Sequence, residues 1–191
     1  MIIEGLVTTT DAAGGMHVAA MGPWVDEGER DAGPITRLVL RPFASSQTGA
    51  NLRLRPEGVF HITDDVLLLA GIVAGGLESP PPAHGAPGGH RWLLDDFCRA
   101  WEFVVESVDA SEDRLRLDVR VVAEHAGRPF LGFNRAAHAV VEAAILITRR
   151  HLLGADEVRR RLGELSVLVE KTGGERERRA FSLLEARAAG G

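Results

Sequence analysis

The hydrophobic pattern of this 191-residue chain changes its period part-way along, and this change limits the folds that the chain can adopt. From Leu115 to Val121, apolar residues alternate with charged ones, as expected for a strand with one buried face. The run Trp101–Val105 alternates in the same way. Because only a short polar turn separates the two runs, the pattern predicts an antiparallel hairpin.

After about Gly127 the apolar residues follow helical spacing instead. Two such stretches, separated by Gly154, contain Ala137, Val140, Val141, Ala144 and Ile145, and then Val158, Leu162, Leu165 and Val169. We therefore expect a mainly β domain over residues 1–123, followed by a helical appendage of about three helices over residues 124–191. The predicted fold class is α+β.

The first third of the chain adds further β-prone runs. Residues 2–10 and 17–25 flank a turn rich in Gly and Asp, which indicates a second hairpin. Short strands are expected at 36–41 and 58–63. A helix is expected over residues 66–74, capped by Asp64 or Asp65, and the Gly/Pro-rich stretch from Gly75 to Gly89 is expected to be loop.

Composition excludes several classes of function. A formal net charge of −5 argues against a nucleic-acid-binding surface, which normally carries a basic excess. The longest apolar stretch, residues 66–77, is too short to cross a bilayer, and the N-terminus lacks the basic segment of a signal peptide. We expect a cytoplasmic protein without membrane or nucleic-acid partners.

Residues 40–52, LRPFASSQTGANL, are the strongest candidate for a binding site. They predict a strand end and a Pro turn, with a helix start capped by Ser45 or Ser46. Free N–H groups at a helix start favour an anion, and Ser45, Ser46 and Thr48 add hydroxyl donors. Arg41 can clamp a phosphate with two hydrogen bonds. The alternative is a capped helix beside a surface arginine.

Other candidates carry less chemistry. His84, His90, Asp95 and Asp96 are close in sequence, but they lack both a helical pair spacing and a cysteine partner, so we expect no metal site. The single cysteine, Cys98, lies beside Phe97 in an apolar and acidic run with no evident basic microenvironment, so we expect a buried, inert thiol.

Two segments resemble a known superfamily. IIEGLVTTTDAAGGMHVAAMG is similar to the first hairpin of the FMN-binding split-barrel proteins, which include flavin reductases and pyridoxamine phosphate oxidases. It departs from their pattern at Ala20, where they carry proline. LRPFASSQTGANL followed by GVFHITDD looks more specifically like the family called domain of unknown function 447, which pairs a split barrel with a C-terminal helical domain.

This resemblance implies an antiparallel split β-barrel that binds FMN, as a homodimer with the flavin near the subunit interface. The matching phosphate-binding positions are Arg41, Ser45, Ser46, Thr48 and Asn51. The candidates to line the flavin ring are His17, Ala19, Met21, Pro42 and Phe43.

Three functions remain open at this stage. The first is an FMN-dependent oxidoreductase acting on a small molecule, with a catalytic residue and an electron donor still unknown; His17 is the candidate proton donor. The second is a non-catalytic module that holds a flavin, another phosphate ligand or haem. The third is an interaction protein with a vestigial cofactor pocket.

Overall fold

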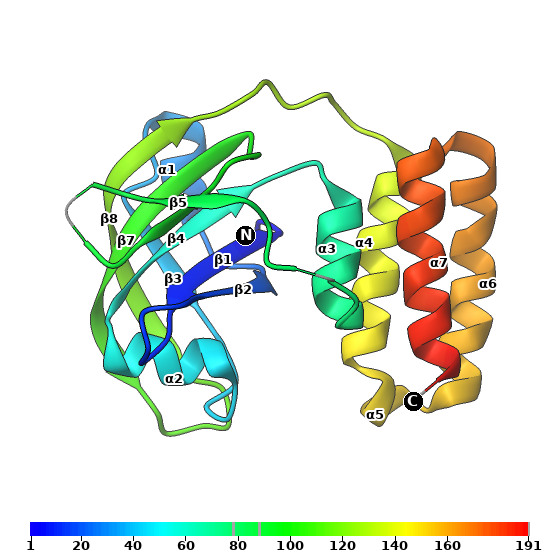
Figure 1. Ribbon diagram of the computed structural model, residues 1–191, viewed down its shortest axis with the longest axis horizontal. Helices are drawn as coiled ribbons and strands as arrows, with labels where there is room; N and C mark the ends of the chain where they lie inside the picture. Colours follow the sequence, from blue (N-terminus) through cyan, green and yellow to red (C-terminus); the bar gives the residue numbers. More distant parts are fainter. Residues whose placement is uncertain (78, 88, 191) are drawn as a thin grey trace. The chain divides into compact units, whose positions relative to one another are not determined.

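The computed structural model describes residues 1–77, 79–87 and 89–190, and the chain forms two compact units (Figure 1). The first unit comprises Met1–Thr63 and Pro80–Pro129. The second comprises Asp64–Ser79 and Phe130–Gly191. Each unit has its own buried apolar residues.

The first unit is built on a six-stranded antiparallel sheet with the strand order β2-β1-β4-β7-β8-β3. Both predicted hairpins are confirmed, one formed by β1 and β2 and the other by β7 and β8. The strands are β1 (Gly5–Thr10), β2 (Met16–Met21), β3 (Arg37–Leu40), β4 (Glu57–Ile62), β7 (Arg99–Asp109) and β8 (Arg116–Ala126).

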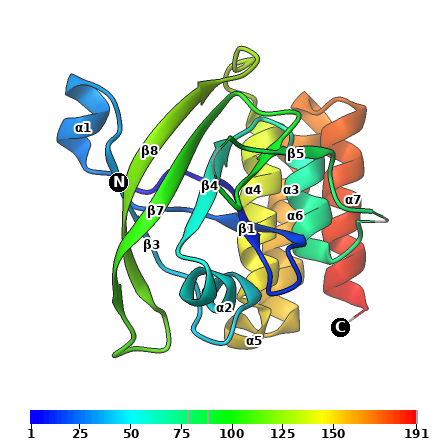
Figure 2. The ribbon, with the colours of Figure 1, turned by 60° about the vertical axis from the view of Figure 1, so that its left-hand side comes forward.

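The sheet curves around its core. β7 and β8, each of 11 residues, bend along their length (Figure 2), and two register shifts interrupt their pairing. Such shifts are β-bulges, which bend a strand and increase its twist. The concave face buries the alternating apolar residues that the sequence indicated, among them Leu38, Leu40, Phe60, Phe103, Leu117 and Val119.

The two edges of the sheet meet at Trp24. This residue forms a bridge to Ile2 on one side and to Val39 on the other. Because these are isolated bridges between described residues rather than a continuous ladder, the barrel is split and does not close fully. Helix α1 (Glu27–Ala32) follows, with Asp26 as its N-cap.

Strand β1 is buried on both faces although it ends in three consecutive threonines. Their burial is tolerated because each threonine hydroxyl takes part in a hydrogen bond. The Thr8 hydroxyl donates to the Trp92 carbonyl at 2.6 Å, and the Thr10 hydroxyl donates to the carbonyl of His90. Thr9 accepts a hydrogen bond on the opposite face from Asn51. Three consecutive threonines therefore join β1 to the elements that cover it.

The elements that cover Thr8 and Thr10 belong to a small hairpin. It consists of β5 (Ala83–Gly85) and β6 (Trp92–Leu94), paired with each other. The prediction that the whole stretch from Gly75 to Gly89 is loop is therefore wrong at β5; positions 78 and 88 lie outside the described residues. The error arose because three residues rich in Gly and Ala carry no strand signal, and only the pairing with β6 makes them one.

The second unit is helical. Helices α3, α4, α6 and α7 pack alongside one another (Figure 1), with the short α5 between α4 and α6. Asp65 and Asn134 cap α3 and α4 by accepting hydrogen bonds from N–H groups of the first turn. The helices are α3 (Val66–Ala74), α4 (Arg135–Thr148), α5 (Arg150–Leu153), α6 (Ala155–Thr172) and α7 (Glu175–Ala189).

This division differs from the expected boundary at residue 123. Strand β8 continues to Ala126, and α3, which the sequence places inside the β domain, packs with the C-terminal helices α4 and α7. The helix itself is apolar on all sides, which indicates burial but not the partner against which it is buried. The helical unit is thus assembled from two separate segments of the chain.

Candidate functional site

The turn after β3 is fixed against the start of β8. The Leu115 N–H donates to the Pro42 carbonyl, and the Ala44 N–H donates to the Asp113 carbonyl, both at 2.9 Å. Phe43 forms an isolated bridge with Arg114. The turn is therefore held on both sides of Phe43, and it sets where the following helix begins.

Helix α2 (Gln47–Leu54) begins at Ser46, as predicted for one of the two serines. The Ser46 hydroxyl donates to the Phe43 carbonyl at 2.7 Å and accepts from the Gly49 N–H at 3.1 Å. Within the described part of the chain, the N–H groups of Gln47 and Thr48 donate to no other group. Two N–H groups at a helix start thus remain able to bind an anion.

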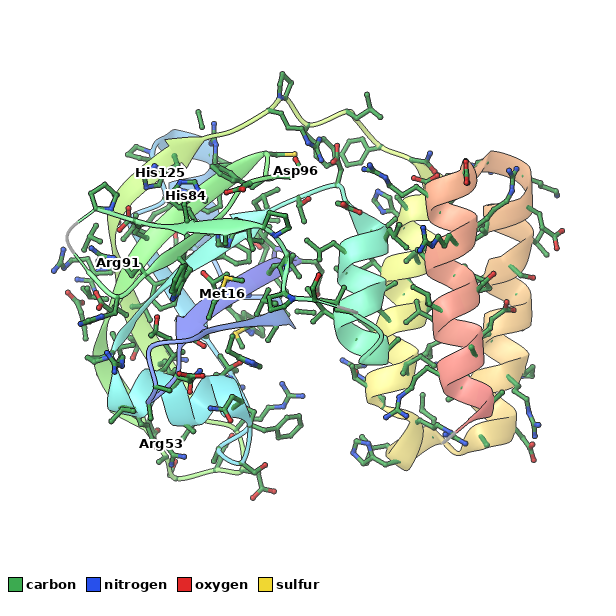
Figure 3. The ribbon with its side chains drawn as sticks, viewed as in Figure 1. Met16, Arg53, His84, Arg91, Asp96 and His125 are labelled. Carbon is green, nitrogen blue, oxygen red and sulfur yellow. The ribbon has the colours of Figure 1, made fainter. Side chains whose placement is uncertain are left out.

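Arginine side chains surround this turn. Arg53 donates to the Ala44 carbonyl at 2.9 Å and lies on α2 (Figure 3). Arg114 donates to the Arg41 carbonyl at 3.2 Å, and its guanidinium lies 4.0 Å from the centre of the Phe43 ring. These contacts leave most of the guanidinium donors available and make the turn electropositive.

Arg41 is the predicted phosphate clamp, and in the structure it pairs with Glu112 at 2.8 Å. Both side chains are substantially exposed, so the ion pair contributes at most about 1 kcal/mol and can be exchanged for a stronger partner. The Arg41 Nε atom is buried and has no hydrogen-bond partner among the described residues. An unsatisfied buried donor of this kind fits a site that gains an acceptor when a ligand binds.

Asn51 connects α2 to the first hairpin. Its side-chain nitrogen donates to the Thr9 hydroxyl at 3.0 Å, and its oxygen accepts from the Gln47 side chain at 2.7 Å. Thr9 pairs directly with His17 across β1 and β2, so both side chains lie on the same face of the sheet. The structure therefore brings Asn51 and His17 to the same region, with Thr9 between them.

His17 is half-buried on the edge strand β2. Burial lowers the pKa of its imidazole, and the negative charge of Asp11 opposes this effect only in part. The ring is therefore neutral near pH 7, with one nitrogen able to donate and the other able to accept a hydrogen bond.

The remaining predicted residues occupy different environments. Ser45 and Phe43 are exposed, Pro42 is buried, and Met21 packs against the core of the sheet. Arg41 lines a cavity of about 320 Å³ on the outer face of the sheet, next to Trp24, Val39 and Arg116. No described residue of α2 lines this cavity.

A group of buried charges, which the sequence did not predict, lies next to the β5–β6 hairpin. Glu102 forms an ion pair with Arg91 at 2.7 Å and contacts His125 at 2.7 Å, and both Arg91 and His125 are labelled in Figure 3. Arg91 also lies 3.5 Å from Glu57. The one indication in the sequence was Glu102, a charged residue within the apolar run Trp101–Val105. Because it alternates with apolar residues, it was expected to face solvent rather than a covering hairpin.

His61 lies beside this group and is fully buried. Its Nε2 atom accepts from the Leu94 N–H at 3.2 Å, which also ties β6 to β4. The pKa of His61 is lowered to about 4, mainly by burial, with a smaller contribution in the same direction from the nearby His125.

The described residues contain no group of three or more His, Cys, Asp or Glu side chains arranged to hold a metal ion. His84, one of the metal candidates, instead forms a pair with Asp95 at 2.8 Å. None of the described helices is both long and apolar enough to cross a membrane.

The sequence matches two family models. Residues 3–128 match the model described as "Protein of unknown function (DUF447) N-terminal domain", and residues 134–186 match "Protein of unknown function (DUF447)". The chain belongs to the DUF447 family. The resemblance seen in the two sequence segments is thereby confirmed. No protein with a curated function matches the chain.

Solved structures share the fold. An FMN-bound DUF447 protein from Methanosarcina mazei is 19% identical, with a TM-score of 0.81 over 97% of this chain and 94% of that one. The flavin reductase of styrene monooxygenase from Pseudomonas putida is 14% identical, with a TM-score of 0.52 over 66% of this chain and 81% of that one. An FMN-binding protein from Thermus thermophilus is 15% identical, with a TM-score of 0.52 over 66% and 76%.

The two levels of similarity correspond to the two units. The flavin reductase and the Thermus protein match about two thirds of the chain, whereas the DUF447 structure matches nearly all of it. The first unit therefore has the flavin-reductase-like split-barrel fold, and the DUF447 chain adds the helices.

Proposed function

We propose that this DUF447 protein binds FMN and uses it as an oxidoreductase on a small molecule. The observation that carries the proposal is the α2 start, where two N–H groups without acceptors lie next to an arginine-rich turn. The FMN-bound relative from Methanosarcina mazei, similar over almost the full length, supports the choice of FMN as the anion.

The residues around the turn would have two roles in phosphate binding: some would contact the phosphate directly, and others would support the turn. The N–H groups of Gln47 and Thr48 would donate to its oxygens, and Arg41 would exchange Glu112 for it, satisfying the buried Nε. Arg53 and Arg114 already donate to carbonyls of the turn, so they add positive charge and hold the turn in place.

The flavin ring would supply the redox chemistry, and this chain would position it. Arg114 covers one face of Phe43, so only the other face of that ring could contact the flavin. His17 lies on the strand face that also carries Thr9, to which Asn51 of α2 donates, and as a neutral imidazole it could donate a hydrogen bond to the ring.

We further propose a homodimer, with a second copy completing the flavin site. The support is that the cavity lined by Arg41 has no described lining residue from α2, whereas cofactor sites normally bury most of the ligand. The single cysteine fits a reducing compartment, and we propose the cytoplasm as the location.

The test is the colour and the redox behaviour of the purified protein. We expect a yellow protein whose flavin absorbance bleaches when NADH or NADPH is added without oxygen. A flavin that binds but that neither nucleotide reduces would favour a carrier, or an enzyme supplied by another electron donor. A colourless protein that gains no thermal stability from added FMN would contradict the proposal.

A further inference from the structure

The helical unit contains a cavity of its own. It measures about 620 Å³ and lies where α3, α4, α5, α6 and α7 come together. This size falls within the roughly 300–1,000 Å³ typical of small-molecule sites. All the lining residues belong to the helical unit: Val73, Ile147, Thr148, Arg150, His151, Ala155 and Arg187.

The polar lining of this cavity is basic. Arg150, His151 and Arg187 line it, and no described carboxylate does. In the described chain none of these three side chains forms an ion pair. The neighbouring arginines of α6 behave differently, since Arg159 and Arg160 both pair with acidic residues of their own helix. The cavity thus gathers positive charge that the protein itself does not neutralise.

The first residue of α6 also lines the cavity. This residue is Ala155, and the N-cap of its 18-residue helix is Gly154, which has no side chain to cap it. Among the described groups, no acceptor takes the Ala155 N–H. A helix start without a cap favours an anion, which adds to the charge of the arginines. The two acidic residues that follow, Asp156 and Glu157, are engaged by Arg159 and Arg160.

The rest of the lining is apolar. Val73 from α3 and Ile147 from α4 contribute aliphatic surface, and Thr148 adds a hydroxyl that donates to the Ile145 carbonyl at 2.8 Å. A fully hydrated inorganic ion would leave this aliphatic surface without a partner. The lining is therefore suited to a ligand that carries both a negative head and an apolar body.

We propose that the helical unit holds a second ligand site, distinct from the proposed flavin site, for a small organic anion with an apolar body. Arg150, His151 and Arg187 bind the anionic head together with the α6 start, and Val73 and Ile147 contact the body. An alternative role for Arg150 and Arg187 is to complement the helix dipoles, since they lie near the C-terminal ends of α4 and α7. That role explains the positive charge, but it requires neither a cavity nor an uncapped helix start beside the arginines.

The test uses the full-length protein as purified and octanoate as the probe, followed by isothermal titration calorimetry. Octan-1-ol serves as the uncharged probe of the same length. We expect octanoate to bind, and octan-1-ol to bind at least tenfold more weakly, because charge-assisted hydrogen bonds to the head are missing.

The variant Arg150→Gln/Arg187→Gln is expected to lose octanoate affinity by roughly tenfold or more. The matched control is Arg178→Gln/Arg179→Gln, which removes the same charge from exposed positions near the other end of α7 and should leave the affinity unchanged. Thermal melts of both variants, recorded in parallel, separate a loss of binding from a loss of folding.

Three outcomes would overturn the proposal. The first is wild-type protein that gives no binding heat with octanoate, and the second is equal affinity for octanoate and octan-1-ol. The third is a cavity variant that melts at a lower temperature but binds octanoate as the wild type does, because its arginines would then serve only the helix ends.

Discussion

Gly49 shows how a single atom sets the geometry of the proposed phosphate site. A Cβ at this position would lie 2.6 Å from the Phe43 carbonyl oxygen and 3.3 Å from a methyl group of Leu115. Backbone cannot give way as a flexible side chain does. The close approach of α2 to its preceding turn, and hence the direction of the free N–H groups, depends on the absence of that atom.

We expect Gly49→Ala to lower the free energy of unfolding by about 1–3 kcal/mol, because the turn or the helix must shift to admit the methyl group. The matched control is Gly163→Ala in α6, where an added Cβ has no neighbour within 4 Å. There the same substitution should stabilise by roughly 0.5–1 kcal/mol through helix propensity. Urea unfolding of both variants measures the difference, and effects of the same sign would contradict this reading of Gly49.

His61 gives the protein a specific pH dependence. Its pKa is about 4 in the folded chain, against 6.5 for an ordinary histidine, because burial disfavours the charged ring. Between pH 6.5 and about pH 4 the histidine binds a proton in the unfolded chain but not in the folded chain. The free energy of unfolding therefore falls as the pH falls through this range. The full loss is about 3 kcal/mol, reached near pH 4.

The measurement is urea unfolding at several pH values between 7 and 4. His61→Gln removes the titrating ring, and we expect the dependence on pH to become shallower by about that amount. His84→Gln, a change at an exposed histidine, should leave the wild-type dependence intact. If His61→Gln and the wild type lose stability in parallel, the buried ring is not the cause.

At the scale of elements, the β5–β6 hairpin is fastened to the sheet by buried charges and by hydroxyl groups. Arg91, just before β6, contacts Glu102 on β7, and Glu102 contacts His125 on β8. Breaking a buried ion pair by removing one partner leaves the other charge unbalanced, which is more costly than losing a surface pair.

We therefore expect Glu102→Gln to destabilise the protein by about 3 kcal/mol and to speed amide exchange in the β5–β6 hairpin. Glu106→Gln is the control on the same strand, since Glu106 pairs with Arg37 and Arg120 at the surface. Its effect should stay below about 1 kcal/mol. Similar losses in the two variants, with unchanged exchange in the hairpin, would show that Glu102 does not fasten it.

Elements with a strong period could be predicted from the sequence, and those defined by pairing could not. The alternation of apolar residues such as Leu117 and Val119 predicted β8, and the capping residue Ser46 indicated the start of α2. In contrast, β5 exists only through its pairing with β6. The buried carboxylate of Glu102 has the same origin, because its partners come from distant parts of the sequence that no local pattern connects.

In the candidate site, too, the contacts between residues distant in sequence could not be predicted from a local pattern. The sequence indicated the segment Arg41–Asn51 from its helix cap and hydroxyl residues, and the structure adds the arginines that approach from elsewhere. Arg114 looked like the solvent face of a strand, yet it lies over Phe43. Asn51 was proposed as a phosphate ligand, and the structure places its amide between Gln47 and Thr9.

At the scale of the whole molecule, the helical unit depends on a segment that lies early in the sequence. Helix α3 leaves the β unit after Thr63 and packs against α4 and α7 before the chain returns at Pro80. Its apolar composition predicted burial but could not say in which unit, because hydrophobicity is not directional.

We expect a fragment of residues 130–191 to melt without cooperativity, since the faces of α4 and α7 that α3 covers would meet water. The same fragment with residues 64–79 joined through a flexible Gly/Ser linker should melt cooperatively. Circular dichroism during heating distinguishes the two. A sharp, reversible transition in the shorter fragment would show that α3 is dispensable for the helical fold.

The phosphate site is tested most directly by comparing FMN with riboflavin, which lacks only the phosphate, in fluorescence titrations of protein freed of flavin. We expect FMN to bind at least a hundredfold more tightly than riboflavin, as several charge-assisted hydrogen bonds require. Arg41→Ala should weaken FMN binding by about 1.5–3 kcal/mol and leave riboflavin binding unchanged. Equal affinities of the wild-type protein for FMN and riboflavin would contradict a phosphate site at the start of α2.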